Sequence, residues 1–389
     1  MTINNEHKKL NVPNLRFKEF EGEWEKCKLG EIATICGGYA FNSKELSSKK
    51  GLYQVVKMGN LYQNNLDLSR TPSFINYIDS KSNKVLLHYG DIAITLTGTN
   101  NKRDFGYSYM FTTEQNLLLN QRCGLIRTEH NPYFVFNLVK TNSFLNQFFE
   151  SSTGGTGNQA NVSTKSMESF SVYIPKSKEQ RKIADLLRLI DERIATQNKI
   201  IDKLQSLIKG IRNDVYGKLR KSVGFNAMIS DVLSYEQPQP YIVENTEYTA
   251  EGIPVLTANK AFVLGYTSET DGIYDKGDCI IFDDFTLDCK YVDFPFKVKS
   301  SAIKILTAKD KELLRYTFEF MKYLDLSTDE HKRHYIAETQ NQELFLPTAQ
   351  VVRTIAHAFS ALSSRMKTVT KQRDLFELQK QYLLRQMFI

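Results

Sequence analysis

Residues 178–216 are the sequence feature that most constrains the fold. Apolar side chains recur there in alternating steps of three and four residues, the period of a heptad coiled coil rather than of an ordinary surface helix. A helix of this length would extend about 58 Å. Pro175 precedes the run and Gly217 follows it, as is common at the two ends of a helix. We therefore predict a long helix at residues 176–216. Its apolar positions are Ile183, Leu187, Ile190, Ile194, Ile201, Leu204, Ile208, Ile211 and Val215, with Gln197 as the one polar interruption.

The same pattern returns about 172 positions later in the chain. Residues 170–175, an extended segment that ends in proline, match residues 342–347, and the heptad register continues through the second copy. At the second junction Val351 and Val352 stand in place of Glu179 and Gln180. A shared strand–proline–helix junction in register indicates an internal repeat, with a second long helix at residues 348–389. The matched helix positions are Arg181/Arg353, Ile183/Ile355, Ala184/Ala356, Leu187/Phe359, Ile190/Leu362, Ile194/Met366, Leu204/Phe376 and Ile211/Leu383.

Short β-like runs broken by turn residues precede each predicted helix. Residues 1–175 and 217–347 are therefore predicted to form two β-rich domains. Each contains a Gly-Asp pair that leads into an apolar strand, at Gly90 and at Gly277, and each has one helical segment, at 133–149 and at 313–323. The predicted fold class is α+β, with two β-rich domains that are each followed by a long helix. Two seams of the same register bury each other most simply as an antiparallel coiled coil with pseudo-twofold symmetry.

Composition narrows the classes of function. There is no apolar run long enough to cross a bilayer and no signal sequence at residues 1–9, so we expect a cytoplasmic protein. The five cysteines never form a CxxC pair, which favours buried reduced thiols over a disulfide framework or a zinc site. The formal charge of +7 permits nucleic-acid binding without requiring it.

The chain resembles the specificity subunit of type I restriction–modification enzymes. The resemblance rests on the order of domains, on the Tyr-Ile-Pro-x-x-x-Glu-Gln-x-x-Ile-Ala junction at residues 173–184, and on the opening Trp24…Leu29-Gly-Glu-Ile32. It implies that each β-rich unit is a target recognition domain for one half of a split, asymmetric site in double-stranded DNA. It further implies that the two helices set the spacing between the half-sites and dock the modification subunits.

The resemblance also implies that this chain catalyses no reaction and binds no cofactor itself. Two modification (methyltransferase) subunits would bring S-adenosylmethionine and methylate adenine, and two restriction (translocase/nuclease) subunits would use ATP and Mg to translocate and cut DNA. The sequence agrees, since it has neither a GxxxxGK[ST] phosphate loop nor a GxGxxG motif after a strand.

Three short motifs suggest chemistry but have simpler interpretations. Asn131-Pro-Tyr-Phe134 lacks the second proline of an amino-methyltransferase signature, and we interpret it as a helix-starting turn. Asp283, Asp284 and Asp288-Cys-Lys290 resemble a nuclease set but suit a turn better. His331 and His334 lack a third candidate ligand, so no metal site is predicted.

Polar, basic and aromatic residues on loops that differ between the two repeats are the candidates for DNA contact, because such residues contact phosphates and base edges. Solvated loop polarity is the alternative for any single residue. In the first repeat the candidates are Thr97, Thr99, Asn100, Lys102, Arg103, Asn120, Gln121, Arg122, Thr156, Asn158, Gln159 and Asn161. In the second they are Asn259, Lys260, Thr286, Lys290, Lys299, Lys332, Arg333, His334 and Tyr335.

A different class of function remains open. A protein in which two domains are joined by two long helices could also serve as a stand-alone architectural DNA-binding protein or as a protein–protein scaffold. The basic outer faces of the helices, with Arg181, Lys182, Arg188, Arg193, Lys199 and Lys203 on the first, suit spacer DNA, an acidic partner or plain solvation equally well.

Overall fold

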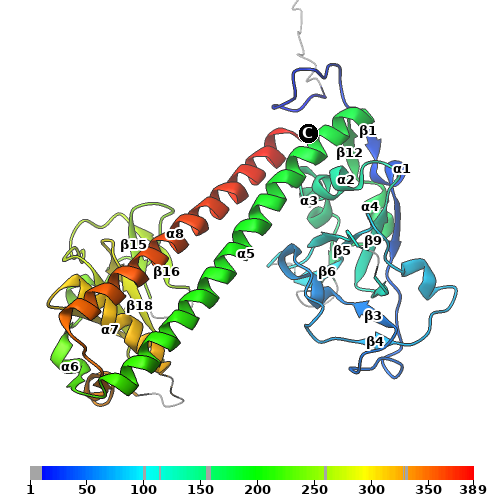
Figure 1. Cartoon of the computed structure of the whole chain (residues 1–389). Helices are drawn as coiled ribbons and strands as arrows, with labels where there is room; N and C mark the ends of the chain where they lie inside the picture. Colours follow the sequence, from blue (N-terminus) through cyan, green and yellow to red (C-terminus); the bar gives the residue numbers. More distant parts are fainter. Residues whose placement is uncertain are drawn as a thin grey trace, which may run out of the picture. The chain divides into compact units, whose positions relative to one another are not determined.

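The computed structural model describes residues 11–99, 102–113, 115–154, 159–257, 261–326, 328 and 332–389. The chain divides into two compact units. Unit 1 comprises residues 1–196 and 373–389, and unit 2 comprises residues 197–372. Two long helices, α5 (Ser177–Ser222) and α8 (Ala349–Gln386), each contribute one part to unit 1 and the other part to unit 2 (Figure 1). None of the described helices is both long and apolar enough to span a membrane.

The described residues of unit 1 form four small sheets. An antiparallel sheet has the order β2-β9-β5-β7, a second has the order β4-β3-β8 with β3 and β8 parallel, and β1-β12 and β10-β11-β6 complete the set. The elements are β1 (Glu25–Lys28), α1 (Leu29–Ile32), β2 (Thr34–Gly37), β3 (Tyr53–Val56), η1 (Met58–Asn64), β4 (Phe74–Ile75), η2 (Ser82–Val85), β5 (Ile92–Thr95), β6 (Thr97–Thr99), β7 (Ser108–Met110), β8 (Leu117–Leu119), β9 (Cys123–Arg127), α2 (Pro132–Leu138), α3 (Asn142–Glu150), β10 (Thr153–Gly154), β11 (Gln159–Asn161), α4 (Thr164–Glu168) and β12 (Ser171–Ile174).

Unit 2 repeats this plan. Its four-stranded sheet has the order β14-β20-β17-β18, its three-stranded sheet has the order β16-β15-β19 with β15 and β19 parallel, and β13 pairs with β21. The elements are β13 (Ala227–Met228), α6 (Ile229–Val232), β14 (Leu233–Glu236), η3 (Gln239–Tyr241), β15 (Ile253–Leu256), β16 (Val263–Thr267), β17 (Cys279–Asp283), β18 (Cys289–Val292), β19 (Lys297–Val298), β20 (Ile303–Ala308), α7 (Lys311–Leu324), η4 (Thr339–Asn341) and β21 (Glu343–Leu344). The internal repeat predicted from the junctions is confirmed: in both units, the strand before the long helix pairs antiparallel with the strand that opens the unit.

Two predicted helix boundaries are wrong. The segment 133–149 is two helices, α2 and α3, rather than one. The Thr141 hydroxyl accepts a hydrogen bond from the Phe144 amide at 3.3 Å and so starts α3 afresh. Helix α5 does not end at Gly217 but continues to Ser222. Gly224, with φ of +72°, follows its last turn, so the left-handed residue that stops the helix is a different glycine.

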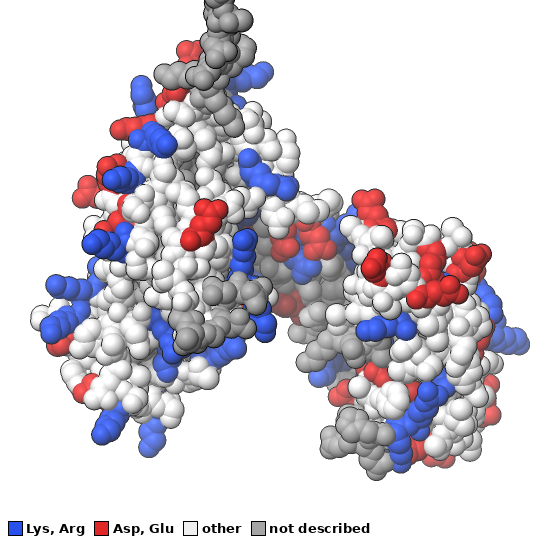
Figure 2. All heavy atoms as spheres, turned by 180° about the vertical axis from the view of Figure 1, so that it is seen from behind, with Lys and Arg blue, Asp and Glu red and all other residues white. Residues whose placement is uncertain are grey.

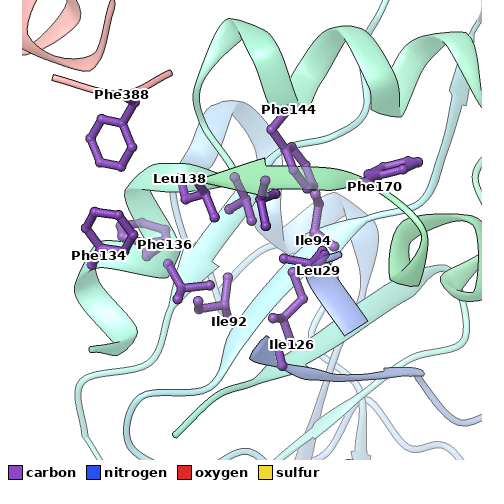
Figure 3. Close-up of a cluster of buried hydrophobic side chains, with 14 of the residues drawn as sticks. Leu29, Ile92, Ile94, Ile126, Phe134, Phe136, Leu138, Phe144, Phe170 and Phe388 are labelled. Atoms are coloured by element: carbon purple, nitrogen blue, oxygen red, sulfur yellow. The ribbon is translucent and has the colours of Figure 1, made fainter. Parts of the chain in front are cut away.

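The apolar seam of α5 is buried or half-buried along its length. In unit 1, Ile183, Leu187 and Ile190 share a core with Leu383 of α8. The same core contains Phe388, whose ring stacks on Phe134 at 5.1 Å between centroids (Figure 3). In unit 2, Tyr216 of α5 and Val352 and Phe359 of α8 belong to one core with α7. Each unit therefore buries its own portion of both helices.

Candidate nucleic-acid interface

Three predicted loop segments of unit 1 come together. Strand β11 pairs with β6, so that Gln159 lies opposite Thr99 and Asn161 opposite Thr97. The segment that ends at Arg122 joins them, because the Leu96 amide donates to the carbonyl of Arg122 at 3.0 Å. Segments separated by more than twenty residues in sequence thus form one surface at the end of the four-stranded sheet.

The polar side chains of this surface point outward. Gln159 and Asn161 are exposed, whereas Ala160 between them is fully buried, as the period of a strand requires. Lys102 and Arg103 are exposed, and Thr97 and Thr99 are half-buried. Asp104 fixes the turn that carries the two cations, since its Oδ1 accepts from the Thr99 amide at 2.6 Å. The side chains of Gln159 and Asn161 thus lie on the exposed face of β11.

One candidate in this unit needs correction. Asn120 is only 9% exposed, because its amide donates to the carbonyl of Val56 and its own carbonyl lies against Gly38. Its side chain is therefore not presented to a ligand, whereas its neighbours Gln121 and Arg122 are exposed. Asn100, Thr156 and Asn158 lie outside the described residues.

The structure adds a segment that the sequence prediction missed, η1. The Thr97 hydroxyl lies 3.2 Å from the sulfur of Met58, and the Asn64 side chain accepts from the Ser108 amide at 2.8 Å. Tyr62 is half exposed, and Gln63 and Asn64 have φ of +52° and +61°, values that non-glycine residues adopt mainly at constrained sites. The repeat could have revealed it, because Asn259 and Lys260 follow β15 as η1 follows β3.

In unit 2 the candidate loops converge on the buried carboxylate of Asp284. Its Oδ1 accepts from the amides of His334 and Tyr335 at 3.1 and 2.8 Å. Its backbone amide donates to the carbonyl of Ala302 at 3.0 Å. Its other oxygen lies 3.6 Å from the ammonium of Lys304 in a fully buried pair. The turn after β17, the loop before β20 and the loop at 332–335 are thereby held together.

This anchoring corrects two further candidates. The side chains of His334 and Tyr335 are each 1% exposed, because their amides are drawn onto Asp284, so the prediction that they face DNA is wrong for these side chains. Lys299, Thr286, Lys332 and Arg333 are exposed. Lys290 is half-buried and ion-paired with Asp288 at 3.2 Å. Asn259, Lys260 and His331 lie outside the described residues.

The side chains of Asp283 and Asp288, like that of Asp284, make structural contacts. Asp283 accepts from the Phe285 amide and from the Thr286 hydroxyl at 2.9 and 2.7 Å, the pattern of an Asx turn. Burial acts to raise the pKa of Asp288, but the hydrogen bond and charge of Lys322 hold it below its usual value. Within the described ranges, no three His, Cys, Asp or Glu side chains form a group that could hold a metal ion.

The sequence 131–134 likewise has a local role. The Asn131 side chain accepts from the Phe134 amide at 3.0 Å and caps α2, with Pro132 at the first helical position. This agrees with a helix-starting turn.

Lysine and arginine side chains are spread over the face seen in Figure 2 with acidic side chains among them. On this face, charge alone does not mark one binding surface, so loop geometry is the better guide.

The sequence and the fold of this chain are similar to those of known proteins. Residues 21–206 match the family model described as type I restriction modification DNA specificity domain. A curated relative, the type I restriction enzyme EcoR124I/EcoR124II specificity subunit of Escherichia coli, is 44% identical over 126 residues. That match covers 31% of this chain and 31% of the relative, so it spans about a third of either protein. The crystal structure of the type I restriction–modification system S subunit from M. genitalium has the same fold, with a TM-score of 0.66 at 14% identity over 97% of this chain and 99% of that one.

Proposed function

We propose that this chain, whose residues 21–206 match the family model of the type I restriction modification DNA specificity domain, is the DNA-recognition subunit of a type I restriction–modification system. Each unit recognises one half of a bipartite, asymmetric site in double-stranded DNA. The chain itself catalyses no reaction. It directs adenine methylation by two modification subunits and cleavage by two restriction subunits, which bind S-adenosylmethionine, ATP and Mg.

The observation that carries this proposal is the repetition of one frame with different loops. Both units have the same three sheets in the same strand order. The loops at their ends differ: unit 1 uses the small sheet β10-β11-β6, and unit 2 uses the segments gathered by Asp284. Two domains that share a fold but differ in their exposed loops are suited to recognise two different DNA sequences. An asymmetric split site requires this.

The long helices are proposed to set the distance between the two DNA half-sites. Helix α5 begins in unit 1 and ends in unit 2, whereas α8 begins in unit 2 and ends in unit 1. Both contribute apolar side chains to the core of each unit. This opposite order supports an antiparallel coiled coil, in which the helix length fixes the spacer.

Co-expression with the cognate modification subunit, followed by sequencing of methylated adenines, tests the function. A split motif with two short specified halves is the expected result. If the complex forms and no adenine is methylated, the recognition-subunit proposal fails, and a stand-alone architectural or scaffold protein is the better account. If the split motif is found, replacing residues 153–161 with a loop of different sequence should alter only one half of the motif.

A further inference from the structure

Unit 1 contains a cavity of about 650 Å³ beside its loop surface. Three cationic side chains line it: Arg103 from the turn after β6, Lys140 from the turn between α2 and α3, and Lys380 from α8. The cavity is large enough for a nucleotide-sized ligand. Aromatic walls from Tyr107 and Phe149 complete it.

Lys140 is the unusual member of this set. Its ammonium lies 3.6 Å from the centroid of the Phe136 ring, and among the described residues it has no carboxylate within ion-pair distance. Burial lowers the pKa of Lys140 to about 7, with the charge of Lys380 adding to the effect and Asp191 opposing it. A half-buried ammonium without an anionic partner favours an anion that enters the cavity.

Lys380 and Arg103 line the same cavity as this ammonium. Lys380 is ion-paired with Asp191 at 2.7 Å, and Asp191 also accepts from the Tyr133 hydroxyl. The Arg103 guanidinium lies over the Phe149 ring at 5.0 Å, and the Arg103 amide donates to the carbonyl of Thr99. Arg103 thus belongs both to the cavity and to the loop surface proposed to meet DNA.

We propose that this cavity binds a phosphate group, with Lys140 and Arg103 as its cationic contacts. The inference rests on the proposed function in one respect, because Arg103 lies in the turn that follows β6, and this position favours a phosphate of the DNA backbone that lies next to the first half-site. A free nucleotide or inorganic phosphate would satisfy the same chemistry. Such a contact positions DNA without reading its sequence.

The proposal has a pH signature with a defined sign. A lysine whose pKa is lowered carries its charge below that pKa and loses it above, so a phosphodiester of the DNA backbone, whose own charge is the same at both values, binds more tightly at about pH 6 than at about pH 8. The charged and titratable groups that face Lys140 are Arg103, Lys380, Asp191, Glu377 and Tyr133. Lys140→Arg keeps the charge at both pH values and removes this dependence.

The test compares the full chain with Lys140→Met, Lys140→Arg and a control, Lys178→Met, which removes an exposed lysine of α5 outside the cavity. Fluorescence anisotropy with a mixed-sequence duplex is measured against salt at both pH values, and calorimetry is run with adenosine monophosphate and with inorganic phosphate. For Lys140→Met we expect the slope of log K against log salt to fall by about 1 and affinity at ~0.1 M salt to fall about 8-fold. Circular dichroism checks that the variants are folded.

The two binding measurements, with duplex and with monophosphate, distinguish a phosphate of the DNA backbone from a free phosphate ligand. Loss of duplex affinity in Lys140→Met, with a flat pH profile in Lys140→Arg and no change in Lys178→Met, identifies the DNA backbone. Unchanged duplex binding with loss of monophosphate binding identifies a free ligand and supports the cavity. If neither probe responds to Lys140, the inference is overturned. If the unmodified chain binds no duplex at all, the recognition function fails, while the monophosphate arm still decides the cavity.

Discussion

The guanidinium of Arg16 donates two hydrogen bonds to the carboxylate of Glu179, at 2.7 and 2.8 Å. Glu179 is 3% exposed and also accepts from the indole of Trp24 at 3.3 Å. The neighbouring Leu15 amide donates to the carbonyl of Gln386 at 2.8 Å. The segment before β1 is thereby fastened to the first turn of α5 and the last turn of α8 in unit 1.

The second junction of the repeat is held by different contacts. In unit 2 the chain enters directly from α5, and the Asn226 side chain makes two hydrogen bonds to the backbone of Leu346, at 2.9 and 2.7 Å. No arginine equivalent to Arg16 meets α8 among the described residues there. Val351, the counterpart of Glu179, is 39% exposed, whereas Val352, the counterpart of Gln180, is 5% exposed and packs in the core.

The Arg16–Glu179 pair is expected to be strongly coupled. Arg16→Met leaves a buried carboxylate without its cation and should reduce the free energy of unfolding by about 3 kcal/mol. Arg16→Met with Glu179→Val imitates the second junction and should recover most of that loss. Urea unfolding of the two single variants and the double variant measures the coupling. Glu19→Ala, which removes the half-exposed partner of Lys182, is the control and should change little. Additive effects would contradict the coupling.

Two glycines near the end of α5 should respond in opposite directions. Gly217→Ala places a methyl group in a helix interior where a Cβ meets nothing within 4 Å, so stability should rise by about 0.8 kcal/mol. Gly224→Ala forces alanine into a left-handed conformation at φ +72° and should reduce stability by about 1 kcal/mol. Thermal unfolding of both variants checks the sign. A loss of stability in Gly217→Ala would place the end of the helix where the sequence alone suggested.

The thiols should react slowly in the folded protein. Burial raises the pKa of Cys123, Cys279 and Cys289 to about 12, and that of Cys27 to about 11. Few of these thiols are ionised at neutral pH, and the thiolate is the reactive form. With a disulfide reagent, we expect Cys27 and Cys36, which are half-buried, to react first and all five cysteines to react only after unfolding. Rapid reaction of Cys123 in the native chain would refute the predicted burial.

Helix length should control the spacer. A seven-residue helical insertion between Ile194 and Ile208, matched by one between Leu362 and Phe376, adds about 10 Å, or roughly three base pairs at ~3.4 Å each. Mapping of methylated adenines should show a longer spacer and unchanged half-sites. The same seven residues inserted after Gly224, beyond the end of α5, are the control and should leave the spacing as it was. Unchanged spacing with the paired insertions would refute the proposal that helix length sets the spacer.

The repeat, the two long helices and the strands after the Gly-Asp pairs were predictable because they depend on local sequence patterns. Heptad spacing along residues 183–215 and the proline junctions at Pro175 and Pro347 appear in the sequence whatever the rest of the chain does. Strands β5 and β17 follow the predicted Gly-Asp pairs at Gly90 and Gly277, since a short apolar run between turns is itself a local signal. The loops that meet in unit 1 were also predictable as segments, because they follow predicted strands.

Which side chains those loops expose was decided only by the tertiary structure. His334 and Tyr335 have the composition of a ligand-binding loop, yet the buried carboxylate of Asp284, fifty residues earlier in the chain, binds their amides and turns both side chains inward. Lys140, Lys380 and Arg103 line one cavity only because the turns after α2 and β6 lie beside α8 in the folded unit. Periodicity records which face of an element is apolar, but long-range hydrogen bonds and burial determine which polar groups remain free for a ligand.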